Sequence, residues 1–303
     1  MTSNEPFWDF YWETRLQAME NLGKREAILS GSVLIRCMAS ELNHPLRLLE
    51  LGCGEGQVIG ALLDAHSQVC DVRTSVGVDY NAQSLAVCRR EYRGMTCIEG
   101  DFTDPHLLEK LGKFDLVLLV NALHEVFSAT RSEEKGEVDV PLAKERVEQA
   151  LGRAADCLKP TGWLVLFDGL EQPGDLRDTV RIRFLDGQSR ADFENFALTY
   201  QPFHVQYQPT DDPLTIDLPR RDFTRYITKS IFLQKGLWKT ERFESYQYFN
   251  QSEFVAAFAR QGLRISELRT LTVNEDKWRR RIEVIHPPES FPEEHILILA
   301  QRG

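Results

Sequence analysis

Between residues 46 and 168 the sequence alternates short apolar runs with amphipathic stretches, and this alternation restricts the folds open to the chain. The apolar runs predict buried strands, and the stretches between them space apolar residues three and four apart, as helices do. Strands joined by helices form right-handed βαβ units, which build a parallel sheet covered on both faces. The expected strands are 46–51, 75–79, 95–100, 114–120 and 163–168, and the expected helices are 57–66, 81–92, 104–111 and 141–158.

The remaining segments complete the sheet or lie outside it. The first 45 residues predict helices with a break at Gly23, and Asn81 is the expected N-cap of the helix at 81–92. The pattern lapses over residues 171–250 and returns with a helix at 251–263 and strands at 264–271 and 295–301. We therefore expect an α/β fold with a doubly wound, seven-stranded, mostly parallel sheet and a mainly helical cap insertion. The expected parts are a helical cover at 1–45, a core at 46–170, a cap at 171–250 and a C-terminal completion of the sheet at 251–303.

The stretch LELGCGEG, residues 49–56, joins the first expected strand to the helix that follows it. Its glycines permit a tight turn and let the backbone approach a ligand closely, and the helix N-terminus offers free N–H groups to an anionic group. Asp79 ends the next strand, where a carboxylate can accept hydrogen bonds from both ribose hydroxyls. These features predict a nucleotide-type ligand, although a glycine-containing turn without a ligand is the alternative. The GxGxG spacing differs from the GxGxxG of nicotinamide dinucleotide enzymes and disfavours a dehydrogenase.

Taken in order, the stretches LELGCGEG, GVDY, EGDF, FDLVLLVNALHEV and LKPTGWLVLFDG resemble the motifs of class I S-adenosylmethionine-dependent methyltransferases. The resemblance is closest over residues 46–168. It implies a Rossmann-like fold with strand order 3-2-1-4-5-7-6, in which strand seven is antiparallel. It also implies the cofactor S-adenosyl-L-methionine and the product S-adenosyl-L-homocysteine.

The resemblance assigns parts of the cofactor to individual residues. Glu50 and the glycine loop would surround the methionine part, Asp79 would hold the ribose, and Asp101 and Phe102 would flank the adenine. Asn121 would lie beneath the cofactor at the end of strand four, and two residues before the first strand are candidates for covering it. The expected cofactor-binding residues are Glu50, Gly52, Cys53, Gly54, Gly56, Asp79, Tyr80, Asp101, Phe102, Asn121, Tyr11 and Arg15.

His124 and Glu125 follow strand four, at the sheet edge where ligands bind in open α/β folds. A histidine that titrates near neutrality can serve as a general base for a hydroxyl nucleophile. The placement resembles the HDW motif of plant-type aromatic O-methyltransferases, with Glu125 in the acidic position. We therefore expect His124 and Glu125 to be the catalytic residues. In the alternative, His124 packs beneath the methionine part or caps the next helix.

The segment 171–250 holds 14 aromatic residues, which indicates a lid over an apolar or aromatic molecule, a small core of its own, or both. We therefore expect a small-molecule acceptor, methylated at an oxygen. A protein or RNA acceptor is one alternative, and a cofactor-binding protein without turnover is another. The cluster Arg279–Arg281 could bind a substrate carboxylate or phosphate, or form a solvated face.

Charge and composition narrow the expected partners. The chain has 46 acidic and 36 basic side chains, a formal net charge of −10, which disfavours nucleic acid and anionic membranes as partners. No apolar run reaches the roughly 18 residues that span a bilayer, and the first residues lack a secretion signal, so a cytoplasmic location is expected. The six cysteines and seven histidines have no zinc-ligand spacing, so no metal is expected.

Overall fold

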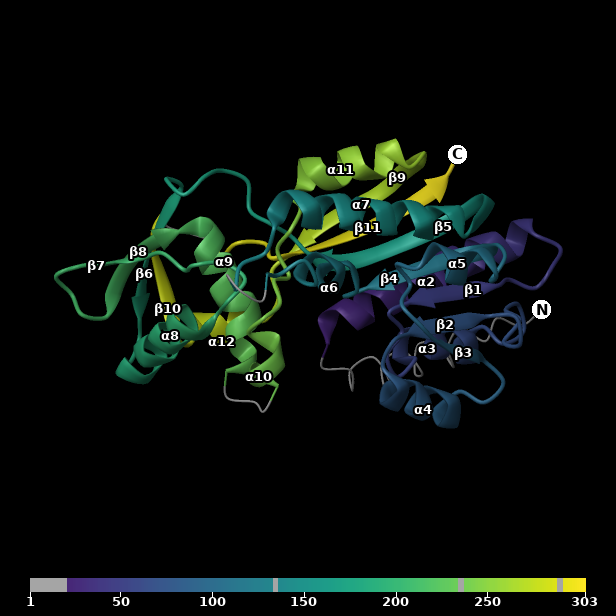
Figure 1. The fold of residues 1–303 in the computed structure, drawn as a ribbon, viewed down its shortest axis with the longest axis horizontal. Coiled ribbons are helices and arrows are strands. Elements are labelled where there is room, and N and C mark those ends of the chain that lie inside the picture. Colours follow the sequence, from purple (N-terminus) through teal and green to yellow (C-terminus); the bar gives the residue numbers. More distant parts are fainter. Residues whose placement is uncertain (1–20, 133–135, 234–236, 288–290) are drawn as a thin grey trace.

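The computed structural model describes residues 21–132, 136–233, 237–287 and 291–303, and Figure 1 shows its ribbon. Seven strands form the larger sheet, in the order β3-β2-β1-β4-β5-β11-β9. Strands β1 to β5 pair with one another in parallel, and β11 is antiparallel to both β5 and β9. The strands are β1 (Leu48–Leu51), β2 (Val76–Asp79), β3 (Thr96–Glu99), β4 (Phe114–Val120), β5 (Leu158–Gly169), β9 (Leu263–Leu271) and β11 (His295–Arg302). The order and the antiparallel last strand confirm the sequence prediction.

Helices cover both faces of this sheet. The helices of the core are α2 (Leu22–Glu41), α3 (Gln57–Ala65), α4 (Ala82–Glu91), α5 (Pro105–Glu109), α6 (Leu123–Ser128), α7 (Val140–Asp156) and α11 (Gln251–Arg260). One apolar cluster joins the sheet to α5, α6, α7 and α11, and a second joins its other face to α2, α3 and α4. Figure 1 shows α7 and α11 along one side of the long strands. Successive side chains of β4 point to opposite faces of the sheet and so pack into the two clusters in turn, because both faces of this strand are buried.

The expected elements of the core form within a few residues of their predicted bounds, and the Asn81 side chain caps α4 by accepting from the N–H groups of Gln83 and Ser84. The expected helix break at Gly23 is wrong. Helix α2 begins at Leu22 and continues through Gly23. A Cβ atom at Gly23 would lie 2.3 Å from Cε1 of Phe167, so glycine here lets the start of α2 approach strand β5 closely.

The expectation of a mainly helical cap is also wrong, because the cap contains an antiparallel sheet in the order β10-β6-β8-β7. Its strands are β6 (Thr179–Phe184), β7 (Gln208–Pro209), β8 (Thr215–Pro219) and β10 (Ile282–His286). In β6 every second residue is buried, the alternation of a strand with one covered face. Its partner β10 comes from the C-terminal segment, a hundred residues further along the chain. The helices of this layer are α8 (Gly187–Thr199), α9 (Arg220–Lys229), η1 (Ser230–Phe232), α10 (Trp238–Glu241) and α12 (Glu275–Arg279).

The cap has an apolar core of its own and lies beyond the carboxyl ends of the parallel strands, as Figure 1 shows. Its buried aromatic rings include Phe184, Phe193, Phe196, Tyr200, Phe223, Tyr226, Trp278 and Phe291. Most of the aromatic content of the cap therefore stabilises the cap itself. Among the described residues, no helix combines the length and the apolar content that crossing a membrane requires.

Candidate active site

The glycine loop between β1 and α3 has a backbone that only glycine adopts easily. Gly52, Gly54 and Gly56 have φ angles of 75°, 51° and 76°. A Cβ atom at Gly52 would lie 2.8 Å from Cβ of Ala122, and one at Gly56 would lie 2.5 Å from Sγ of Cys88. At Gly54 a Cβ atom would meet no heavy atom within 4 Å. The loop is thus packed at both ends and open in the middle, where a ligand can approach the backbone.

Two carboxylates of the predicted set hold this loop in place. Oε2 of Glu50 accepts from the N–H of Ile59 at 2.9 Å, which caps the start of α3. Oδ2 of Asp79 accepts from the N–H of Gly54 at 2.7 Å, and its Oδ1 accepts from the N–H of Asn81 at 2.8 Å. Burial raises the pKa of Glu50 to about 8. Cys53 of the same loop is buried as well.

A first cavity, of about 690 Å³, adjoins the adenosine end of the predicted cofactor site. Tyr80, Asp101, Phe102 and Glu125 line it from the core. The pKa of Tyr80 is raised to about 12, chiefly by the charge of Glu125 and by burial. Burial raises the pKa of Glu125 itself. Further residues that line this cavity are Thr103, Val126, Ser128, Ala129, Arg131, Arg146, Gln149, Arg153, Phe243 and Glu244.

A second cavity, of about 260 Å³, lies between the core and the cap. Asn121, at the end of β4, is the predicted cofactor residue that lines it. The residues of its apolar wall are Leu22, Phe167, Ile227, Ile231 and Phe232. Its further residues are Asn21, Gly23, Thr228, Tyr246, Val273, Asn274, Lys277, Glu294 and His295. The two cavities therefore meet the predicted cofactor site at different points, the first beside Asp101 and the second beside Asn121.

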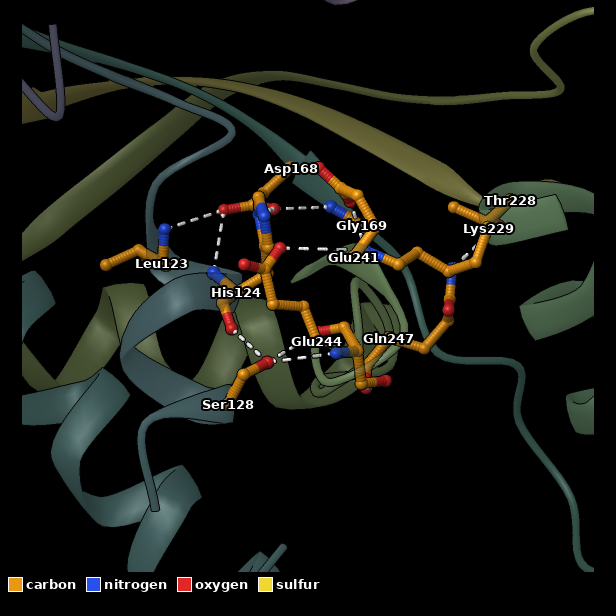
Figure 2. A network of polar contacts seen from close by, with 11 residues as sticks. Leu123, His124, Ser128, Asp168, Gly169, Thr228, Lys229, Glu241, Glu244 and Gln247 are labelled. Atoms are coloured by element: carbon orange, nitrogen blue, oxygen red, sulfur yellow. Dashed lines mark hydrogen bonds and ion pairs between the residues drawn. The ribbon is translucent and has the colours of Figure 1, made fainter. Parts of the chain in front are cut away.

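His124 is buried near the carboxyl ends of β4 and β5, where it contacts Asp168. Its Nδ1 lies 2.8 Å from Oδ1 of Asp168, the last but one residue of β5, as Figure 2 shows. The N–H groups of Leu123 and His124 both donate to Oδ2 of Asp168, at 2.8 and 3.2 Å, so this carboxylate also caps α6. The ring of His124 stacks on Tyr246 with centroids 3.7 Å apart. Burial lowers the pKa of His124, but the charge and hydrogen bond of Asp168 outweigh it, so the pKa is raised.

A buried lysine of the cap also contacts the ring of Tyr246. Nζ of Lys229 lies 4.3 Å from the Tyr246 ring centroid and pairs with Glu241 at 2.5 Å and Glu244 at 3.6 Å. Figure 2 shows Lys229, Glu241 and Glu244 in the same region as His124 and Asp168. Burial lowers the pKa of Lys229. Tyr246 thus contacts both His124 of the core and Lys229 of the cap.

Sequence reasoning assigned no role to Asp168, Tyr246 and Lys229. Asp168 stands in the stretch LKPTGWLVLFDG, so its position after a strand was a usable signal, whereas nothing local marks the other two. Of the two expected catalytic residues, Glu125 lines the first cavity, whereas His124 lines neither cavity. Tyr11 and Arg15 lie outside the described residues.

The cluster Arg279–Arg281 is engaged within the cap. Nε of Arg279 donates to Glu275 at 2.8 Å, and Arg281 binds Asp192 and Ser189. In the described part of the chain, no three His, Cys, Asp or Glu side chains are arranged to hold a metal ion.

One family model and several solved structures are similar to this chain. Residues 49–166 match a family model described as a methyltransferase domain. No curated protein sequence matches the chain at a significant level. Among solved structures, an S-adenosylmethionine-dependent methyltransferase from Clostridium acetobutylicum has 12% identity and a TM-score of 0.46, over 99% of this chain and 100% of that one. Magnesium protoporphyrin IX methyltransferase from Synechocystis has 9% identity and a TM-score of 0.46, over 97% and 94%.

The CurJ carbon methyltransferase has 15% identity and a TM-score of 0.46, and this chain spans only 54% of that chain's length. The family match covers the glycine loop, Asp79, Asp101, Asn121 and His124, which are the parts of the site already described. The chain therefore contains a methyltransferase domain at residues 49–166.

Proposed function

We propose that this enzyme methylates a small apolar or aromatic molecule at an oxygen atom. The observation that carries the proposal is the second cavity, which has an apolar wall from both core and cap and polar groups at Asn121. Its volume of about 260 Å³ is below the usual range for drug-sized ligands, roughly 300 to 1,000 Å³. A compound of one or two rings therefore fits better than a peptide or a nucleic-acid strand.

The residues around the glycine loop fit S-adenosylmethionine. Asp101 and Phe102 would hold the adenine in the first cavity, and the free middle of the loop at Gly54 would face the methionine part. Asp79 already accepts two backbone hydrogen bonds, but each carboxylate oxygen can accept a further one, so ribose hydroxyls can still bind. The remaining end of such a ligand reaches Asn121, which lines the second cavity. An acceptor there would face the methyl group.

When bound, the cofactor would supply a methyl group on a sulfonium, and displacement of that methyl group by an acceptor oxygen would leave the C–S electron pair on sulfur. The residues of the chain then have to align the acceptor, exclude water and accept its proton. The cap residues Ile227, Ile231 and Phe232 would exclude water from the second cavity. The sequence candidates for accepting the proton are Glu125, which lines the first cavity, and His124, which lines neither cavity and could accept a proton only in its neutral form.

Mutation of His124 tests its part in this proposal. If His124 accepts the proton, His124→Asn lowers turnover by about 10²- to 10⁴-fold and leaves the affinity for S-adenosylhomocysteine unchanged. A loss below about tenfold would instead give His124 the role of holding the start of α6 through Asp168.

The function itself is tested with methyl-labelled S-adenosylmethionine. We expect the purified wild-type chain to bind S-adenosylhomocysteine in calorimetry and to transfer label to a member of a panel of hydroxylated one- and two-ring compounds. Label on a protein or RNA from a cell extract, with none on the panel, would favour the macromolecular alternative. Binding without any transfer would favour a protein that holds the cofactor without turnover.

A further inference from the structure

Three buried polar atoms without a hydrogen-bond partner among the described residues belong to residues that line the second cavity. They are Oδ1 of Asn121, Oε2 of Glu294 and Nδ1 of His295. A buried polar atom left unpaired costs roughly 1 to 3 kcal/mol, so each such atom calls for an explanation. All three can accept a hydrogen bond, which makes a ligand with hydroxyl groups the matching partner.

His295 is held rigidly at this cavity and is about nine-tenths buried, with 9% of its surface exposed. It is the first residue of β11 and pairs with Gly169 of β5 on one side and Leu271 of β9 on the other. Its ring stacks on Phe167 with centroids 5.2 Å apart and meets the edge of Tyr246 at 6.3 Å. The sheet therefore holds the backbone of His295, and its ring packs against two aromatic side chains beside the apolar wall.

Glu294 is fixed just as closely. Its Oε1 accepts from the N–H of Val273 at 2.6 Å, which leaves Oε2 as the unpaired oxygen. Oε1 lies 3.8 Å from Nδ1 of His295, beyond hydrogen-bond distance. At this distance the two side chains form an ion pair when His295 is protonated, but Nδ1 of His295 and Oε2 of Glu294 have no hydrogen-bond partner among the described residues. Burial raises the pKa of Glu294.

The backbone at this cavity is also unusual. Asn121 and Asn274, both of which line it, have φ angles of 54° and 61°, in the left-handed region that residues other than glycine rarely adopt. Such conformations persist where the surrounding structure imposes them, and they concentrate at ligand sites. Asparagine adopts this region more readily than most residues, so these angles describe the wall of the cavity and do not by themselves indicate a ligand.

We propose that His295, together with Asn121 and Glu294, binds the hydroxyl end of the acceptor in the second cavity, and that Nδ1 of His295 accepts the hydroxyl proton in place of the sequence candidates His124 and Glu125, neither of which lines this cavity. With its own proton on Nε2, the neutral ring has a free lone pair on Nδ1. The proton moves to that nitrogen, and the acceptor oxygen keeps the electron pair with which it attacks. The inference rests on the proposed function, since it names the acceptor class and the group that selects it.

Nitrogen NMR of the full-length protein labelled with ¹⁵N-histidine tests this directly. Catechol serves as the probe, and toluene serves as a control that fits the apolar wall but donates no hydrogen bond. In protein saturated with S-adenosylhomocysteine, we expect catechol to shift the Nδ1 signal of His295 and toluene to leave it near its starting position. The variant His295→Gln assigns the signal and should weaken catechol binding about tenfold, the loss of one hydrogen bond. His286→Gln, which removes an exposed histidine of β10, should bind catechol as the wild type does.

The outcomes separate this inference from the proposed function. A catechol shift at His124 and none at His295 would overturn the inference, and so would the absence of any histidine response. Unchanged catechol affinity in His295→Gln would overturn it as well. Calorimetry on the same samples reports whether S-adenosylhomocysteine binds, and failure there would refute the proposed function whatever catechol does at His295.

Discussion

Replacing Asp168 with asparagine removes a negative charge from the most deeply buried ion pair of the site. The exposed fractions of the His124 and Asp168 side chains are 2% and 0%. The charge-assisted hydrogen bond from His124 contributes roughly 1.5 to 3 kcal/mol, and removing one partner of a buried pair costs about 3 to 5 kcal/mol. Asparagine still accepts from the N–H groups of Leu123 and His124. We therefore expect Asp168→Asn to lower the free energy of unfolding by about 3 kcal/mol at pH 6.

The pH dependence gives this prediction a second part. In the wild type the folded-state pKa of His124 is raised above 6.5, so its stabilisation is complete below pH 6.5 and is lost as the pH rises through the folded-state value. In Asp168→Asn the burial of the ring dominates and lowers the pKa of His124, so stability from this group increases with pH. The stability difference between the two proteins should therefore shrink from pH 6 to pH 9.

Urea unfolding followed by circular dichroism measures the difference at each pH. Asp217→Asn is the matched control, because Asp217 pairs with Arg181 at the surface of the cap, with 34% and 48% of the two side chains exposed. It should cost less than about 1 kcal/mol. A loss below about 1 kcal/mol for Asp168→Asn, or a difference that is the same at pH 6 and pH 9, would refute the account of a charged His124 held by Asp168.

Three further changes test other parts of the structure. Asp79→Ala should weaken calorimetric binding of S-adenosylmethionine and S-adenosylhomocysteine by about tenfold or more, as loss of hydrogen bonds to a charged group implies, and normal binding would contradict the ribose assignment. The folded-state pKa of Glu50 is about 8, so wild-type stability should fall from pH 4.5 to 8; Glu50→Gln should remove that fall in urea unfolding. Gly23→Ala places a Cβ atom 2.3 Å from Phe167 and should cost about 1 to 3 kcal/mol, whereas Gly187→Ala, with open space around it, should show no such loss in thermal unfolding.

The sequence predicts the core well because its signals are local. The strongly apolar run FDLVLLV forms β4, which is buried along its whole length. Asn81 precedes α4 and caps it, as asparagine commonly does at the start of a helix. The predicted helix break at Gly23 is wrong because glycine is needed there to make room for the ring of Phe167, a residue far along the chain. A glycine required by a close approach looks the same in sequence as one that ends a helix.

The sheet of the cap and the contacts between site residues depend on pairings between distant segments, which no local sequence pattern predicts. The alternation in TVRIRF is a strand signal, but β6 becomes part of a sheet only because β10 returns a hundred residues later. His124 meets Asp168 because β4 and β5 are neighbours and end at the same edge. His295 joins the same region through the antiparallel β11, which follows a proline-rich stretch with no periodic pattern.

A crystal structure with S-adenosylhomocysteine bound would test the central claim most directly, namely that the cofactor runs from Asp101 past Asp79 to Asn121. The account predicts the adenine beside Phe102, the ribose at Asp79 and the sulfur at the opening of the second cavity, near Asn121. A sulfur that faces the first cavity, or a ligand that makes no contact with Asp79, would contradict it.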